Sequence, residues 1–194
     1  MLSHIKAPIK KKPVEGFLPI EDRHARILIL GSMPGEASLA AREYYAHPQN
    51  TFWRILSLLL MFDRNAPYAI KITALKSARI AVWDVLKSCV RSGSADAMIE
   101  RDTQMPNDFL TFFRTHRGIT HVFFNGTAAA ICFRRHALRE TAAPSIRYGS
   151  LPSTSPANAS RSFEEKLQAW RIILPATPHM GTPSPTQRSP LAVQ

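Results

Sequence analysis

Three short polar loops in this sequence carry side chains suited to binding a ligand, and each loop follows an apolar run. Glycines in the first loop would let its backbone approach a ligand closely, although it lacks the spacing of a dinucleotide- or phosphate-binding glycine loop. A plain turn is the alternative, because Gly and Pro close many strand ends. The candidate ligand-contacting residues of the three loops are Gly31, Ser32, Met33, Pro34, Gly35, Asn125, Ser153, Thr154 and Ser155.

Aromatic, amide and histidine side chains gather in the segment 44–53, which reads YYAHPQNTFW. We expect Phe52 and Trp53 to lie in the core, as the first residues of a helix. Tyr44 and Tyr45 precede a polar stretch and are harder to bury fully. An aromatic ring such as Tyr45 beside a ligand loop offers a stacking surface for a base turned out of a duplex.

The elements that hold these loops alternate between strand and helix. Such alternation predicts an α/β fold, a three-layer α/β/α structure with a central, mainly parallel four-stranded sheet. Ligands of such sheets bind beyond the carboxyl ends of the strands. The expected strands are 26–31, 79–83, 121–126 and 145–148, and the expected helices are 51–62, 68–76, 107–116, 127–139 and 162–174, with a helical turn over 84–90.

Composition restricts the class of protein and its partners. Lys and Arg number 25 against 14 Asp and Glu, a formal net charge of +11, which favours a polyanionic partner, although a protein that is merely basic fits as well. An apolar run of about 18 residues, as a membrane helix needs, is absent from the sequence. Residues 1–13 contain lysines but no apolar core, so we do not expect them to act as a secretory signal. Cys89 and Cys132 lie in apolar segments, typical of reduced thiols in a cytoplasmic protein. No His or Cys pair has metal-ligand spacing, so we expect no metal.

The chain divides into three parts. Residues 1–22, with their lysine cluster, are expected to form a flexible basic arm, and residues 176–194 a disordered tail rich in Pro, Ser and Thr. Residues 23–175 are expected to form one domain.

Four motifs in chain order, the first of which combines the first loop with the segment 44–53, resemble the uracil-DNA glycosylase superfamily, and within it the hypoxanthine-DNA (deoxyinosine) glycosylase branch. The resemblance spans roughly residues 26–174. It implies a monomeric enzyme without metal or organic cofactor that flips a damaged base out of DNA and hydrolyses its N-glycosidic bond. Besides the first loop and the segment 44–53, the matching residues are 81–86 (AVWDVL), 124–126 (FNG) and 151–158 (LPSTSPAN).

The resemblance also implies roles for individual residues. Mismatch-specific relatives carry a water-orienting amide at the position of Met33, so the hypoxanthine branch suggests Asn50 as the catalytic amide here. The alternative is that Asn50 caps the following helix, a role that Thr51 can also fill. Asn125 is expected to hydrogen-bond the edge of the base, or else to stabilise the turn after its strand. Leu151 stands where many members have histidine, which argues against a general uracil-excising enzyme.

Two further side chains, His47 and Asp84, lie within these motifs. His47 lacks a nearby carboxylate to orient it, so contact with substrate phosphate or plain packing is favoured over a role as general base. Asp84 is expected to cap a helix, or alternatively to brace the site. No lysine lies in the loops, so a Schiff-base lyase activity is not expected. The competing functions are a mismatch-specific uracil glycosylase, a non-catalytic DNA-binding protein and an enzyme acting on free nucleosides.

Overall fold

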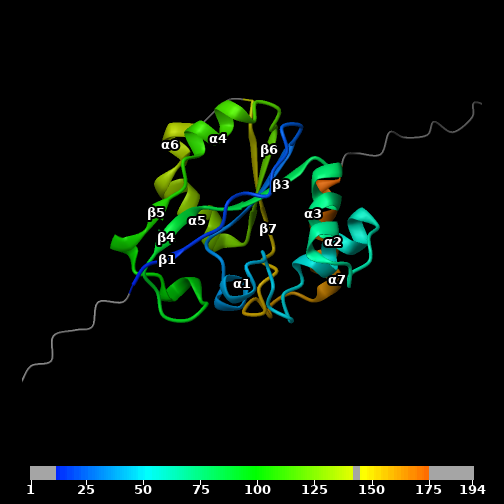
Figure 1. Cartoon of the computed structure of the whole chain (residues 1–194), viewed down its shortest axis with the longest axis horizontal. Coiled ribbons are helices and arrows are strands. Elements are labelled where there is room, and N and C mark those ends of the chain that lie inside the picture. Colours follow the sequence, from blue (N-terminus) through cyan, green and yellow to red (C-terminus); the bar gives the residue numbers. More distant parts are fainter. Residues whose placement is uncertain (1–11, 142–144, 175–194) are drawn as a thin grey trace, which may run out of the picture.

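A parallel four-stranded sheet forms the centre of the protein in its computed structural model, which describes residues 12–141 and 145–174. Its strand order is β3-β2-β6-β7, and all three neighbouring pairs are parallel. Figure 1 shows this sheet edge-on between two helical layers, so the predicted three-layer α/β/α architecture is confirmed. The strands are β2 (Ile27–Gly31), β3 (Ile80–Asp84), β6 (His121–Asn125) and β7 (Arg147–Leu151).

Helices cover both faces of the sheet. One layer holds α4 (Phe109–Thr115), α5 (Thr127–His136) and α6 (Leu138–Thr141). The other layer holds α2 (Phe52–Leu60), α3 (Tyr68–Ser77) and α7 (Phe163–Trp170), while the short α1 (Glu36–Ala41) follows the first loop (Figure 1). Single 3-10 turns complete the described elements, at η1 (Asp96–Met98), η2 (Arg101–Thr103) and η3 (Arg171–Ile173).

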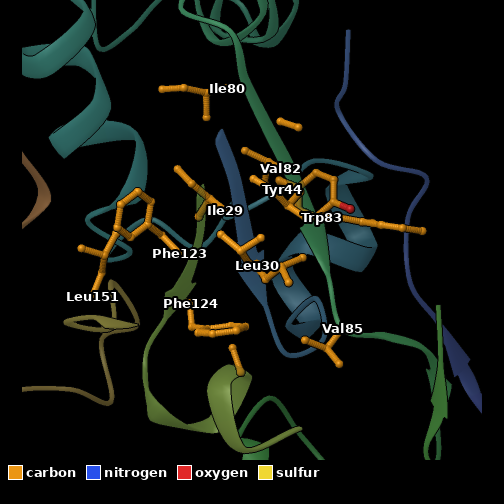
Figure 2. Packing of buried hydrophobic residues seen from close by; sticks show 14 of the residues in the cluster. Ile29, Leu30, Tyr44, Ile80, Val82, Trp83, Val85, Phe123, Phe124 and Leu151 are labelled. Atoms are coloured by element: carbon orange, nitrogen blue, oxygen red, sulfur yellow. The ribbon is translucent and has the colours of Figure 1, made fainter. Parts of the chain in front are cut away.

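The core forms where the apolar strands meet the apolar faces of these helices. Leu28, Ile29 and Leu30 of the inner strand β2 are fully buried, as expected for a strand covered on both faces. Figure 2 shows Ile29 and Leu30 among side chains of β3 and β6. Phe52 and Trp53, placed in the core by the sequence, are buried at the start of α2.

A second, small antiparallel sheet, which the sequence did not predict, is built around the strand that follows β3. It holds β1 (Val14–Glu15), β4 (Leu86–Cys89) and β5 (Met105–Pro106) in the order β1-β4-β5. The helical turn expected over 84–90 is therefore wrong. The backbone N–H groups of Val85 and Leu86 donate to the carbonyls of Gly31 and Ser32, and this pairing holds the chain extended into β4.

Part of the segment expected as a flexible arm is built into this structure. Besides β1, Ile20 is buried and forms an antiparallel bridge with Val82 of β3, with backbone hydrogen bonds in both directions. Residues 12–22 therefore pack along the domain. The remaining arm, residues 1–11, and the expected C-terminal tail lie outside the described residues.

The two cysteines, Cys89 and Cys132, are buried and free, as predicted. Across residues 12–141 and 145–174, no helix is long and apolar enough to cross a membrane.

Candidate functional site

The carboxyl ends of the central strands open into one cavity of about 500 Å³. This size falls within the range of small-ligand sites. Strand register explains the convergence, since Gly31 pairs with Asp84 and Asn125 pairs with Leu151 at the same edge of the sheet. Every residue that the sequence singled out lines this cavity: Gly31, Ser32, Met33, Pro34, Gly35, Tyr45, His47, Asn50, Asn125, Ser153, Thr154 and Ser155.

Asn50 lies in the cavity wall and also contacts the start of α2. It is half-buried, and its Oδ1 accepts a hydrogen bond of 3.0 Å from the backbone N–H of Phe52, the first residue of α2. Thr51 holds the N-cap position without a side-chain cap bond, because its hydroxyl donates instead to the carbonyl of Thr154. A carboxamide oxygen has two lone pairs, so Oδ1 can also accept a hydrogen bond from water.

Tyr45 lies under the first loop in a strained backbone conformation, with φ of +56°. Its ring stacks on Phe52 at a centroid distance of 3.8 Å. The buried hydroxyl has no hydrogen-bond partner among the described residues, and burial, together with the nearby Asp84, raises its pKa. Tyr44, in contrast to the expectation, is fully buried, because its hydroxyl donates to the carbonyl of Leu18 in the segment assigned to the arm.

Asn125 fastens the third loop to the end of β6. Its Nδ2 donates to the hydroxyl of Thr154 at 2.8 Å, and its Oδ1 accepts from the backbone N–H of Thr154 at 2.9 Å. The carboxamide thus stabilises the turn, the alternative that the sequence offered, while it borders the cavity. Trp170, buried in α7, fixes the same loop by donating from Nε1 to the carbonyl of Pro152 at 3.0 Å.

Gly126 allows the third loop to approach β6 closely. Its φ is +98°, a conformation that residues with a side chain rarely adopt. A Cβ at this position would lie 2.7 Å from the Cβ of Ser153. Glycine is therefore required here both by the backbone conformation and by the space available.

A fourth wall of the cavity comes from a loop that carries no motif in the sequence. Ser94, Ala95, Asp96 and Ala97 line the site from residues 92–98. This loop is fixed to the first loop by a hydrogen bond from the hydroxyl of Ser32 to Asp96, and by one of 3.0 Å from the backbone N–H of Glu36 to the hydroxyl of Ser94. The small, polar composition of the loop gave no signal for this position.

Asp84 is the residue whose importance sequence reasoning underestimated. Helix capping, the role favoured for it, is wrong, because a strand follows rather than a helix. It ends β3, and its side chain lies in the cavity wall with only 3% of the residue exposed. Burial raises the pKa of this carboxyl to about 7, with a further rise from Asp96 and a lowering by Arg91. A carboxylate closing an otherwise apolar strand next to Gly31 was the available signal.

The remaining predicted residues occupy different depths of the cavity. His47 is exposed at its mouth, and its Nδ1 accepts from the backbone N–H of Gln49 at 3.2 Å. Met33 is a buried apolar side chain in the cavity wall, whereas Leu151 is buried at the end of β7 and does not line this cavity. Neither a lysine in the cavity wall nor a cluster of three metal-ligating side chains occurs within the described ranges.

Comparison with known proteins identifies relatives over most of the chain. A family model for the uracil DNA glycosylase superfamily matches residues 18–174. A hypoxanthine DNA glycosylase of Methanosarcina acetivorans is 36% identical over 162 residues, which cover 81% of this chain and 96% of that protein. One of Methanosarcina barkeri is 38% identical over 113 residues, 58% of this chain and 70% of that protein.

A solved structure has a similar fold. It is the solution NMR structure of a protein from Methanosarcina acetivorans assigned as a uracil DNA glycosylase. The TM-score is 0.68 at 31% sequence identity, over 84% of this chain and 99% of that one.

Proposed function

Since the chain belongs to the uracil DNA glycosylase superfamily, we propose that it hydrolyses the N-glycosidic bond of a deaminated base in DNA, with hypoxanthine as the preferred base. The observation that carries this proposal is the cavity at the carboxyl edge of the sheet, lined by Asn50, Tyr45 and all three predicted loops. The names of the two hypoxanthine DNA glycosylases support the choice of base. The net charge of +11 suits a DNA partner.

Asn50 is the residue that we assign to catalysis. The target nucleotide turns out of the duplex into the cavity, where the ring of Tyr45 borders the base. The Oδ1 of Asn50, held in place by the N–H of Phe52, accepts a hydrogen bond from a water molecule and aims it at C1′ of the sugar. As an amide does not titrate, this positioning is independent of pH.

Hypoxanthine is favoured over uracil by two apolar residues, Met33 in the cavity wall and Leu151 at the end of β7. The buried side chains of Met33 and Leu151 cannot orient water or stabilise a departing pyrimidine. A purine can instead leave after protonation of one of its own ring nitrogens. A mismatch-specific uracil glycosylase remains the second candidate, and it requires efficient release of uracil despite these two residues.

A single-turnover panel tests the function. Duplexes containing inosine, uracil or xanthine are incubated with excess protein, and abasic sites are detected by alkaline strand scission. Release from the inosine duplex should be fastest, and a free inosine control should remain intact. Binding without release from any duplex would identify a non-catalytic DNA-binding protein, whereas cleavage of free inosine would favour a nucleoside hydrolase.

The role of Asn50 is tested with a matched pair of variants. Asn50→Ala should lower the single-turnover rate by at least about a hundredfold, the contribution of a well-placed catalytic group, with little change in duplex affinity. Gln49→Ala is the control, because Gln49 is exposed and lies next to Asn50 in sequence. A normal rate in Asn50→Ala would remove Asn50 from the mechanism.

A further inference from the structure

The cavity wall contains a buried carboxyl group that lacks the partners such a group normally has. Asp84 is 3% exposed, and no described residue forms a hydrogen bond with its Oδ2. A Cβ placed on Gly31 would lie 2.2 Å from its Oδ1 and 3.0 Å from the unpartnered hydroxyl of Tyr45. Both side chains thus lie close to Gly31 beneath the first loop, and buried polar groups without a partner are costly unless a ligand satisfies them.

The surroundings of Asp84 favour its uncharged form. The ionisable groups that face it are Asp96 of η1, Arg91 after β4, and the phenols of Tyr44 and Tyr45. Arg91 forms no ion pair with Asp84 among the described residues, since its Nη2 donates to the carbonyl of Pro34. Burial and the negative charge of Asp96 outweigh this cation, and the pKa of Asp84 rises to about 7.

An uncharged carboxyl suits the departure of a base. When the glycosidic bond breaks, its electron pair moves onto the base, and a carboxylate in the wall would repel that charge. A neutral carboxyl can donate a proton instead. The other candidates for a proton donor are less suitable. Leu151 replaces the histidine that is frequent in the family, and His47 is exposed at the mouth of the cavity. Asp96 already accepts a hydrogen bond from Ser32, so Asp84 is the cavity carboxyl with an oxygen that has no partner.

We propose that Asp84 is the general acid that protonates the departing base, an inference that rests on the proposed glycosylase function. The proton passes from the Asp84 carboxyl to a ring nitrogen of the purine as the C1′–N9 bond breaks, and both bonding electrons go to the base. Water held by Asn50 adds to C1′, and the proton that it releases restores the carboxyl. The products are the free base and an abasic site.

The test is a pH–rate profile on an inosine duplex under single-turnover conditions, from about pH 5.5 to about pH 9. The wild-type rate should fall about tenfold per pH unit above about pH 7, as Asp84 ionises. Asp84→Asn keeps the shape and a hydrogen-bond donor but cannot release a proton. Its rate should be at least about a hundredfold lower at pH 6 and independent of pH, while duplex affinity stays the same.

Asp96→Asn supplies the second readout, which does not require the Asp84 variant to fold. Because the charge of Asp96 raises the pKa of Asp84, its removal should keep the alkaline fall but move it to lower pH. A merely structural Asp84 would produce no such displacement. The proposal is overturned if Asp84→Asn retains the wild-type profile, or if Asp96→Asn abolishes the fall. If the wild-type protein releases no base at any pH, the proposed function itself fails.

Discussion

Replacing Asp84 by asparagine should stabilise the folded protein, and the gain should grow with pH. In the unfolded chain an aspartate ionises near its ordinary pKa of 3.8, whereas in the fold the carboxyl stays neutral up to about pH 7. Between these values the unfolded state releases a proton that the folded state keeps, so rising pH favours unfolding. Asparagine does not ionise and escapes this penalty.

The size of the effect follows from the two pKa values. Moving a pKa from 3.8 to about 7 corresponds to about 4 kcal/mol, since each pKa unit is worth about 1.4 kcal/mol. The stability attributable to the neutral carboxyl is fully present below about pH 4 and is lost by about pH 7, above which the difference between the two proteins is constant. Between about pH 4.5 and about pH 8, the advantage of Asp84→Asn should therefore increase by about 3 kcal/mol.

Urea unfolding followed by tryptophan fluorescence measures this difference. Both proteins are unfolded at about pH 4.5, pH 6 and pH 8, and the free energies of unfolding are compared at each pH. Ser88→Ala, at a half-buried position of β4 away from the cavity, controls for a general effect of substitution. A stability difference that does not change with pH would show that Asp84 ionises normally, and it would refute the reasoning on its protonation state.

Four further outcomes are expected. Gly126→Ala should lower the free energy of unfolding in urea by about 1–3 kcal/mol. The loss should exceed that of Gly93→Ala, because a Cβ would contact Ser153 at position 126 and has nothing within 4 Å at position 93. Equal losses in the two variants would contradict the role given to close packing. Asn125→Ala should lower the free energy of unfolding by about 1–3 kcal/mol, because two hydrogen bonds to Thr154 are lost. It should also lower the ratio of hypoxanthine release to adenine release. Unchanged stability and selectivity would show that Asn125 has no role in the site. Duplex affinity should fall by about a hundredfold between about 50 and about 200 mM salt, as for about four phosphate contacts; a flat response in fluorescence anisotropy would exclude a phosphate-dominated interface. Borohydride should trap no covalent complex with an inosine duplex, and a trapped species would reveal lyase chemistry.

The strands and the loops at their ends could be predicted because their signals are local. Leu28 to Leu30 form an apolar run closed by glycine, and a similar run, Val122 to Phe124, is followed by Asn125 and Gly126. Parallel strands then bring their carboxyl ends to one edge, which is why the loops near Gly31, Asn125 and Ser153 were expected to line one site. These three loops required only periodicity and topology, whereas Asn50 was assigned to the site through the family resemblance.

The small antiparallel sheet and the fourth wall could not be predicted in the same way. Strand β1 is two residues long and pairs with Ser88 and Cys89, so its stability comes from a partner more than seventy residues away. Residues 92–98 are held at the cavity by hydrogen bonds with Ser32 and Glu36, and no residue spacing in the sequence predicts these bonds. Asp84 was misjudged for a related reason, since its role depends on what surrounds it rather than on its neighbours in sequence.

Thr154 joins three parts of the site that are far apart in the chain. It is fully buried, and its carbonyl accepts hydrogen bonds from the backbone N–H and the hydroxyl of Thr51 at the start of α2. Its own hydroxyl and backbone N–H form two hydrogen bonds with the side chain of Asn125 at the end of β6. A site connected in this way is preorganised: the free protein already holds its walls in register, so an arriving nucleotide need not spend binding energy on ordering them. Under the proposed function, selection among bases would then depend on the fit to walls that are already in place rather than on their rearrangement.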